Sequence, residues 1–296
     1  MEKRIAIIGT GIMGTGMGKT LLSSGFEVKC YNRTKDNAAD LIAAGAEYCN
    51  TPAAAAKGAD FIISMLWDKS AFDSVMNGAD GLIENACSGQ IYIDMSTQLP
   101  EAGVSAAEAF RKNGADFLDA PVHGTKGEAN SGGLWIMAGG EKAVYDRAVQ
   151  VLSVVGETYH YMGGHGKGYA TKLCGNHLVS TIVAALCESM VLASKAGLDP
   201  KEVLKVWMES DFRSPVVEGV GNSIISRDFD VSFHLRTMVK DTELIRNFSE
   251  SLSVPVLLSN IVHEVNKIGL NMGYGEENAS AVVKVFETMA GSKIGD

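Results

Sequence analysis

The chain has 296 residues, of which 46% are hydrophobic and 21% charged, a composition typical of a soluble globular protein with a substantial core. Its formal net charge of −9 at pH 7 argues against nucleic acid or an anionic membrane as a partner. The five cysteines show no C-x-x-C spacing and predict reduced thiols of a cytoplasmic protein, with neither a disulfide framework nor a metal site. We also expect no signal peptide, because the chain enters a predicted strand at once, and no membrane span, because no run of about 20 residues lacks a charge.

Residues 4–34 predict a βαβ unit that binds a dinucleotide. Residues 5–8 (IAII) form a short apolar run of the kind found in buried parallel strands, and a G-x-G-x-x-G pattern follows directly. Apolar residues at helical spacing over 12–22 and a second strand over 26–31 complete the unit. The first glycine of such a turn permits a sharp bend, the second lets a pyrophosphate approach the backbone, and the third lets helix and strand pack closely. The predicted cofactor contacts in this turn are Gly9, Thr10, Gly11, Ile12, Met13 and Gly14.

The residues after the second strand favour NADP over NAD. An NAD site usually has Asp or Glu at this point, which accepts a hydrogen bond from the ribose 2′-hydroxyl. This chain has Asn32, Arg33 and Thr34 instead. Because an arginine forms a charge-assisted fork with a 2′-phosphate, we expect Arg33 to bind that phosphate, with neutral hydrogen bonds from Asn32 and Thr34. The alternative is that Arg33 is an ordinary solvated cation of a loop.

Strands and helices alternate up to residue 163 and predict a doubly wound α/β domain. Further strands are expected over 59–66, 90–95, 116–119, 134–138 and 158–162. Helices are expected over 36–45, 52–57, 100–114 and 141–152, and a helix or turn over 71–78. Such alternation is typical of a parallel sheet with helices on both faces, whose ligand binds at the carboxyl ends of the strands. Residues 1–163 are therefore predicted to be a Rossmann-type NADP-binding domain.

From residue 164 onward the apolar spacing is helical. One long helix is expected over about 168–196, which would measure roughly 40 Å at 1.5 Å per residue. Further helices are expected over 200–209, 216–226, 235–252, 256–270 and 276–290. Residues 164–296 thus predict an all-α domain for substrate binding and oligomerisation, joined to the first domain by the long helix. By analogy, helix packing in this domain favours a homodimer or homotetramer.

Five motifs occur along the chain in a fixed order. They are GTGIMG at 9–14, DMST at 94–97, DAPVHGTKGEANSGGLWIMAGG at 119–140, GHGKGYATKLCGN at 164–176 and FHLRTMVKDTEL at 233–244. With this order and spacing the chain resembles the β-hydroxyacid dehydrogenase family, such as 3-hydroxyisobutyrate dehydrogenases and glyoxylate/succinic semialdehyde reductases. The resemblance implies an NADP-dependent oxidoreductase that transfers hydride between the nicotinamide and a small aldehyde acid or 3-hydroxy acid.

Lys172 matches the catalytic lysine of that family, in the pattern G-x-G-x-x-x-K. Hydride that reaches a carbonyl carbon leaves negative charge on the oxygen, which must then be protonated. A lysine that is partly removed from water beside a cationic nicotinamide gives up its proton more readily. Asn176 follows four residues later, so both side chains can point at one ligand from the same helix face. Without the resemblance, Lys172 would equally be a surface lysine of an amphipathic helix.

Residues 119–125 match the substrate loop of the family, in which a Ser-Gly-Gly sequence holds the substrate carboxylate. This chain has His123, Gly124 and Thr125 at those positions. By resemblance, Gly124 keeps the close backbone approach, and Thr125 keeps an N–H and adds a hydroxyl. His123 would hold an additional anionic group as a cation, or would fill space as a neutral ring. A second departure is Gly175, where the family usually has an asparagine, so one side-chain hydrogen bond to the substrate is lost.

The remaining site residues are assigned by resemblance alone. Lys240, next to Asp241, is implied to reach the cofactor or the substrate acid, and Phe233 to line the pocket. A solvated helix face is the alternative for the charged pair. The matches near the nicotinamide ribose and the substrate are Ser96 and Thr97, and those over the adenine ribose are Met65 and Leu66.

Two other functions fit parts of this pattern. Imine reductases share the fold and an NADP loop of the Asn-Arg-Thr kind, but they typically have another residue in place of Lys172. A non-catalytic NADP-binding scaffold protein would be expected to have lost that lysine. The sequence therefore favours an NADPH-dependent reductase of small aldehyde acids that also runs as a 3-hydroxyacid dehydrogenase.

Overall fold

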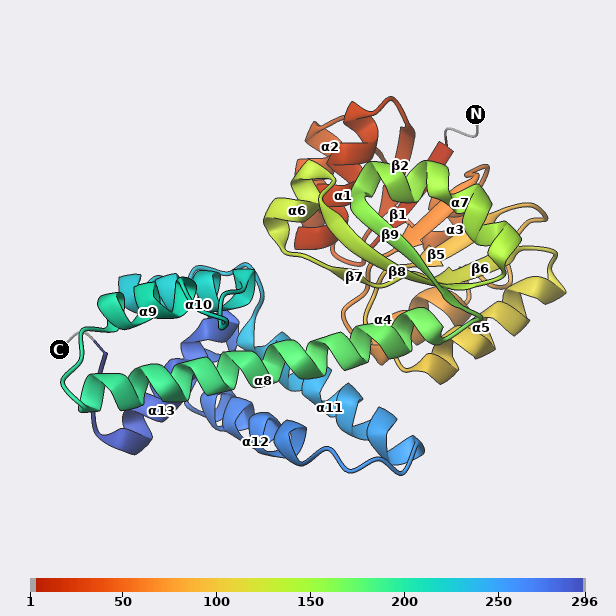
Figure 1. Ribbon diagram of the computed structural model, residues 1–296. Helices are drawn as coiled ribbons and strands as arrows, with labels where there is room; N and C mark the ends of the chain where they lie inside the picture. The colour runs from red at the N-terminus through yellow and green to blue at the C-terminus, as the bar shows by residue number, and fades with distance from the viewer. Residues whose placement is uncertain (1–3, 295–296) are drawn as a thin grey trace. The chain divides into compact units, whose positions relative to one another are not determined.

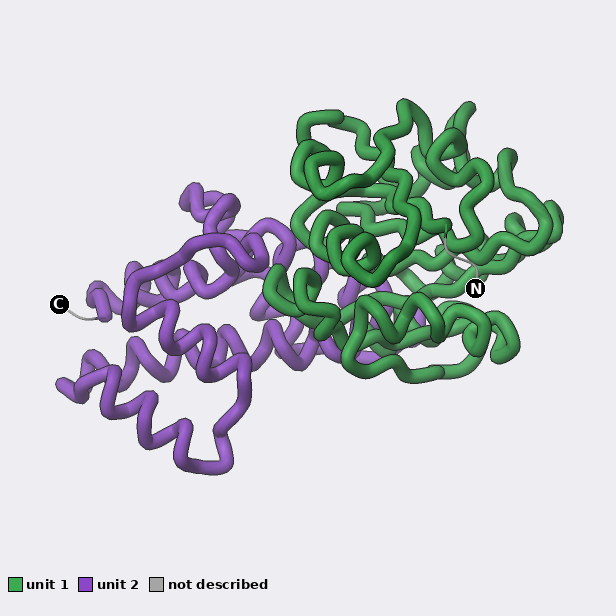
Figure 2. Tube along the Cα trace, turned by 90° about the horizontal axis from the view of Figure 1, so that it is seen from above, with its two compact units in different colours: residues 1–172 green, residues 173–296 purple. Residues whose placement is uncertain are grey.

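The computed structural model describes residues 4–294 and shows a mixed sheet and helices (Figure 1). The chain divides into two compact units, which Figure 2 colours separately. Unit 1 extends to Lys172 and unit 2 begins at Leu173, so the division falls inside a long helix. The domain boundary predicted between residues 163 and 164 stays a prediction.

Unit 1 is built on a predominantly parallel sheet. Its strands are β1 (Arg4–Ile8), β2 (Glu27–Tyr31), β3 (Glu47–Tyr48), β4 (Phe61–Ser64), β5 (Ile91–Asp94), β6 (Asp116–Asp119), β7 (Val122–His123), β8 (Leu134–Gly140) and β9 (Gly156–Gly163). In the sheet they follow the order β3-β2-β1-β4-β5-β6-β8-β7, and β9 pairs with β8. The pairs from β3 to β6 are parallel, whereas β8 runs antiparallel to both β6 and β7. The predicted doubly wound α/β class is confirmed, and the antiparallel β7–β8 pair is an addition that the sequence did not predict.

Helices cover both faces of this sheet. They are α1 (Ile12–Ser23), α2 (Ala39–Ala43), α3 (Pro52–Ala56), α4 (Lys69–Asn77), α5 (Pro100–Lys112), α6 (Lys126–Ser131) and α7 (Lys142–Val155). The helix predicted over 36–45 is instead a 3-10 turn, Lys35–Ala38, followed by the short α2. Alternate residues of β1 enter different cores: Ile5 and Ile7 join one buried cluster, and Ala6 and Ile8 join the other. This two-sided burial explains why residues 5–8 of the strand are all apolar.

Unit 2 consists of helices in the part that the structure describes. The long helix α8 (Lys167–Lys195) enters it from unit 1, and α9 (Pro200–Met208), α10 (Pro215–Ser226), α11 (Leu235–Ser251), α12 (Leu257–Asn271) and α13 (Val283–Ala290) follow. Its core includes Cys187, Met190 and Leu235. The helix predicted over 276–290 is broken, because two 3-10 turns, Tyr274–Glu276 and Ala279–Val282, precede α13. The predicted all-α second domain is otherwise confirmed.

The length and composition of α8 raise the question of a membrane span. Among the described residues, α8 is the one helix that is both long enough and apolar enough to cross a bilayer, judged by length and composition. The core helix of a soluble protein passes the same test, and 44% of the most apolar window of α8 is buried. The finding is weak evidence for a membrane span.

Two buried carboxyl groups attach the beginning of α8 to the sheet of unit 1. Asp94, at the end of β5, accepts hydrogen bonds from the hydroxyls of Ser64 (2.5 Å) and Tyr169 (2.6 Å). Asp119, at the end of β6, accepts from the backbone N–H groups of Gly166 (2.8 Å) and Tyr169 (3.1 Å). Burial raises the pKa of Asp94, and it raises the pKa of Asp119 to about 6 against these hydrogen bonds. The first turn of α8 is therefore held at the carboxyl ends of β5 and β6.

We expect Tyr169→Phe to lower the free energy of unfolding by about 1.5–3 kcal/mol, because a hydrogen bond to a buried carboxyl group is lost. Urea unfolding at pH 7 followed by circular dichroism would measure the effect. Tyr92→Phe is the matched control, since the fully buried Tyr92 donates to the neutral side chain of Gln90 at 2.9 Å. Its loss should be about 0.5–1.5 kcal/mol. Equal losses in the two variants would show that Asp94 does not depend on Tyr169.

Candidate active site

The glycine turn after β1 has the geometry that a pyrophosphate requires. Gly9 has φ +95°, and a Cβ added there would lie 2.3 Å from the carbonyl oxygen of Met65. A Cβ at Gly14 would lie 1.9 Å from the carbonyl oxygen of Gly9, so helix and turn are in contact. At Gly11, in contrast, a Cβ would meet open space among the described residues. The backbone at Gly11, which precedes the first turn of α1, is thus open to an anion, and these residues fit a dinucleotide.

Asn32 joins this turn to the loop after β2. Its side-chain oxygen accepts a hydrogen bond from the backbone N–H of Thr10 at 3.1 Å, and its amide donates to the carbonyl oxygen of Thr34 at 2.8 Å. The amide group is therefore used inside the protein, where the sequence predicted a contact with the phosphate. Arg33 and Thr34 are exposed.

A second cation lies beside this loop. The ammonium group of Lys35 lies 5.1 Å from the ring centroid of Tyr48, whose hydroxyl donates to the backbone oxygen of Asn32 at 3.3 Å. Sequence reasoning missed Lys35, although it follows Arg33 by two residues. The loop after β2 thus has two cations at the carboxyl end of the sheet.

The loop after β4 is held by Ser96. The hydroxyl of this fully buried residue donates to Asp94 at 2.9 Å and accepts from the backbone N–H of Leu66 at 2.8 Å. Both bonds lie inside the fold, so the predicted substrate contact of Ser96 has no support in this structure. Thr97 is half-buried. Met65 touches the glycine turn through its backbone oxygen, as described above, and its N–H donates to Ile8 at 2.9 Å.

Lys172 and His123 come together in unit 1. The ammonium nitrogen of Lys172 lies 3.2 Å from Nδ1 of His123, which is in the short strand β7. Burial, and then the charge of Lys172, lower the pKa of His123 from 6.5 to about 4. A neutral ring at this distance accepts a hydrogen bond from the ammonium group through Nδ1. Two roles were open for His123: a cation that holds an additional anionic group, or a neutral ring that fills space. The lowered pKa disfavours the cation, and the neutral ring contacts the lysine.

The next two residues of the loop contact Glu128. Gly124 has φ +126°, and a Cβ added there would lie 3.1 Å from Cβ of Glu128. The backbone N–H and the hydroxyl of Thr125 both donate to one carboxylate oxygen of Glu128, each at 2.7 Å. The two donors that Thr125 was predicted to offer the substrate carboxylate are thus engaged. Sequence reasoning missed Glu128, although the pattern T-x-x-E at a helix start is a recognisable signal.

In unit 2, three predicted residues form one cluster. The amide of Asn176 donates to a carboxylate oxygen of Asp241 at 2.8 Å, and the ammonium group of Lys240 lies 2.8 Å from the other oxygen. Asp241 is only 2% exposed, which excludes the solvated helix face as a description of this pair. Phe233 is half-buried, and its backbone N–H donates to the side chain of Asn278 at 3.1 Å. Gly175 lies one residue before Asn176 on α8.

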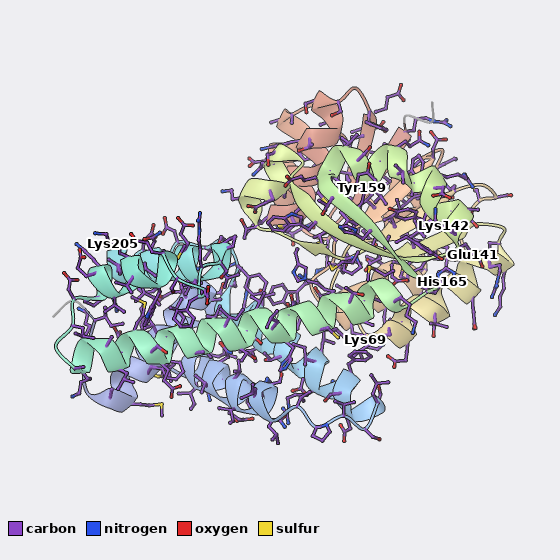
Figure 3. The ribbon with its side chains drawn as sticks, in the orientation of Figure 1. Lys69, Glu141, Lys142, Tyr159, His165 and Lys205 are labelled. Carbon is purple, nitrogen blue, oxygen red and sulfur yellow. The ribbon has the colours of Figure 1, made fainter. Side chains whose placement is uncertain are left out.

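A further histidine lies close in sequence to the docked start of α8. His165 lies in the turn that leads into α8 (Figure 3). Its Nδ1 is buried without a hydrogen-bond partner among the described residues, and burial lowers its pKa. Within residues 4–294, no group of three or more His, Cys, Asp or Glu residues is arranged to hold a metal ion.

Comparison with known proteins matches each half of the chain to a domain of a dehydrogenase. Residues 4–163 match the NAD binding domain of 6-phosphogluconate dehydrogenase, and residues 166–286 match the model for the NAD-binding part of NADP-dependent 3-hydroxyisobutyrate dehydrogenase. The chain is 33% identical over 297 residues to 2-(hydroxymethyl)glutarate dehydrogenase of Eubacterium barkeri, covering 99% of each protein. The chain belongs to the β-hydroxyacid dehydrogenase family. It is also 32% identical to glyoxylate/succinic semialdehyde reductase 1 of Arabidopsis thaliana, over 96% of this chain and 98% of that protein.

Solved structures agree with this assignment. The 3-hydroxyisobutyrate dehydrogenase of Salmonella typhimurium is 25% identical, with a TM-score of 0.87 over 95% of this chain and 99% of that one. A structure of Psf3 in complex with NADP+ and 2-OPP gives 25% identity and a TM-score of 0.88 over the same shares. An imine reductase from Pseudomonas sp. is 20% identical, with a TM-score of 0.66 over 96% of this chain and 99% of that one, and shares the fold alone.

The family resemblance predicted from the five motifs is confirmed. The protein is an oxidoreductase that acts on the CH–OH group of hydroxy acids, of the hydroxyacid dehydrogenase and semialdehyde reductase type, with a pyridine nucleotide as its cofactor. The individual roles of the site residues stay predictions.

We expect the His123 ring to stay neutral down to about pH 5, with an NMR titration midpoint near 4. Because this value lies below the 6.5 of an unfolded chain, the neutral ring contributes stability that is present above pH 6.5 and lost as the pH falls toward 4. In Lys172→Ala the midpoint should rise but remain below 6.5, since burial is the larger cause. A midpoint of 6.5 or above in the unchanged protein would instead favour the alternative in which the ring becomes a cation and binds an acid group.

Proposed function

We propose that this protein is an NADPH-dependent reductase of small aldehyde acids, which runs in reverse as a 3-hydroxyacid dehydrogenase, with Lys172 as its general acid. The observation that carries the proposal is the position of Lys172, whose ammonium group lies 3.2 Å from the neutral His123 ring and one turn beyond the docked start of α8. An ammonium group at a fixed place can protonate an oxygen that gains negative charge.

The glycine turn and the loop after β2 would hold the cofactor. The open backbone at Gly11 would receive the pyrophosphate, and Arg33 would bind the 2′-phosphate with help from the neighbouring Lys35. Asn32 would keep turn and loop together through its bonds to Thr10 and Thr34. When bound, the cofactor would supply the hydride that adds to the carbonyl carbon of the substrate.

Residues of the chain would donate and accept the proton that accompanies hydride transfer. In the direction of reduction, Lys172 gives one proton to the carbonyl oxygen, so that aldehyde, hydride and proton together form the alcohol. The lone pair of Nδ1 of His123 orients the ammonium group, because it accepts one of the three N–H bonds and leaves two for other partners. In the reverse direction, the neutral amine of Lys172 accepts the proton from the hydroxyl group. In unit 2, Asp241 orients Asn176 and Lys240, which are proposed to bind the substrate acid.

The other two functions have less support. The similarity to the imine reductase of Pseudomonas sp. extends to the fold alone. Lys172 also counts against that reaction, since by resemblance imine reductases typically have another residue at this position. A non-catalytic scaffold protein would have no use for a lysine held against a half-buried histidine.

We also propose a cytoplasmic homodimer or homotetramer without nucleic acid or membrane partners. The net charge of −9 supports the second point. The exposed Leu257, Leu258 and Ile261 of α12 support packing against another copy.

Lys172→Ala should retain less than about a tenth of the wild-type rate, because a positioned general acid contributes roughly 10²–10⁴-fold. NADPH oxidation would be measured with glyoxylate, succinic semialdehyde, methylmalonate semialdehyde, tartronate semialdehyde and a cyclic imine. Lys167→Ala, which removes an exposed lysine from the start of the same helix, is the control and should keep full activity. NADPH binding followed by fluorescence should be nearly unchanged in both. Activity on the imine alone, or a fully active Lys172→Ala, would contradict the proposal.

NADPH should exceed NADH in catalytic efficiency by at least an order of magnitude, because an arginine–phosphate fork supplies about 1.5–3 kcal/mol. Arg33→Ala should therefore weaken the binding of NADPH much more than that of NADH, in fluorescence titrations as well as in KM. Lys57→Ala is the control, since this exposed lysine precedes β4 and so belongs to the amino end of the strands, whereas the loop after β2 is at their carboxyl end. Equal losses with the two cofactors in Arg33→Ala would mean that Arg33 does not contact the 2′-phosphate.

A further inference from the structure

The substrate loop of this chain contains its own anion. Thr125 is the residue before α6, and both its backbone N–H and its hydroxyl donate to Oε2 of Glu128, at 2.7 Å each. The two residues form a capping box, and the hydroxyl adds a further bond to the same carboxylate oxygen. One carboxylate thus takes up both donors that Thr125 could offer to a ligand.

This carboxylate is charged. The hydrogen bonds from the side chain and then from the backbone of Thr125 lower the pKa of Glu128, which keeps it ionised at neutral pH. Its other oxygen, Oε1, has no hydrogen-bond partner among the residues of unit 1 that the structure describes. A charged oxygen without a protein partner remains able to accept a hydrogen bond from a bound molecule.

The carboxylate is also held close to the loop. Gly124 packs so tightly against the Glu128 side chain that an added Cβ would lie 3.1 Å from Cβ and 3.5 Å from Cγ of Glu128. His123 supplies no positive charge to balance the Glu128 carboxylate, because its ring is neutral and accepts a hydrogen bond from Lys172. A second anion brought to this loop would meet a like charge and would find the donors of Thr125 already engaged.

We propose that Glu128 determines substrate specificity: it selects 3-hydroxy acids, or the matching aldehydes, that bring a hydroxyl or ammonium donor to this loop, and it rejects those that bring a second carboxylate. The inference rests on the proposed function, since it assumes that residues 123–125 face the substrate. A donor on the substrate bonds to Oε1 of Glu128 without displacing Thr125.

The test uses substrates that share the frame HOCH2–CH(X)–COO− and differ only in the group X. Glycerate has a hydroxyl there, serine an ammonium group, and 2-(hydroxymethyl)succinate a carboxymethyl group, which carries the second carboxylate. The ratio of kcat/KM for glycerate or serine to that for 2-(hydroxymethyl)succinate should be about tenfold or more in the wild type, and Glu128→Gln should lower it by about tenfold or more. Glu108→Gln, which removes the same charge from an exposed position of α5, should leave the ratio unchanged.

A merely structural role would give a different result. If Glu128 only caps α6, Glu128→Gln and Glu128→Ala would lower the melting temperature and reduce kcat/KM for all three substrates in equal proportion. An unchanged ratio of this kind overturns the proposal, whatever the absolute activities are.

A second measurement does not depend on turnover. Malonate, a dicarboxylate without a reacting group, should bind to the NADP+ complex of Glu128→Gln about tenfold or more tightly than to that of the wild type, as measured by calorimetry. Equal dissociation constants would overturn the proposal. Tighter binding by the variant, together with no turnover of any hydroxy acid by the wild type, would support the role of Glu128 and refute the proposed reaction.

Discussion

Two buried carboxyl groups, Asp94 and Asp119, end neighbouring strands of the sheet, and each needs hydrogen-bond donors from a later part of the chain. A carboxyl group that is taken out of water is costly unless its oxygens are hydrogen-bonded. The beginning of α8 supplies those donors through its backbone N–H groups and the hydroxyl of Tyr169. Satisfying the carboxyl groups therefore docks α8 on the sheet, and the docking brings Lys172 to His123. The chemistry proposed for this site depends on a requirement of folding.

Much of this molecule could be predicted from local patterns. The apolar run of β1, the glycine turn and α1 are adjacent in the sequence, and each has a period or spacing of its own, so this βαβ unit was predicted correctly. The helical second domain was predicted for the same reason. The two-residue strands β3 and β7 were missed because so short a segment has no period to detect. The family followed from five motifs in order, which no single pattern would have shown.

The properties of individual side chains were harder to predict, because they depend on residues that are distant in the sequence. His123 and Lys172 are 49 positions apart, so the neutral state of the ring could not be inferred from the loop that contains it. The same holds for Ser96, whose hydroxyl is used by Leu66, 30 positions away. Glu128 is the exception, since it is only three residues from Thr125 and its capping pattern is visible in the sequence.

The close contact at Gly168 has a consequence for the register of α8. A Cβ at this position would lie 2.3 Å from the carbonyl oxygen of Asp119, so the helix touches the backbone of the sheet there. Because each residue turns an α-helix by about 100°, the four steps from Gly168 to Lys172 set the direction in which the amine points. One residue inserted or deleted within them would leave the contact intact and rotate the amine by more than a quarter turn away from His123. The direction of the Lys172 side chain thus depends on the number of residues between Gly168 and Lys172. The side chains of Ala170 and Thr171 within this segment have little influence on that direction.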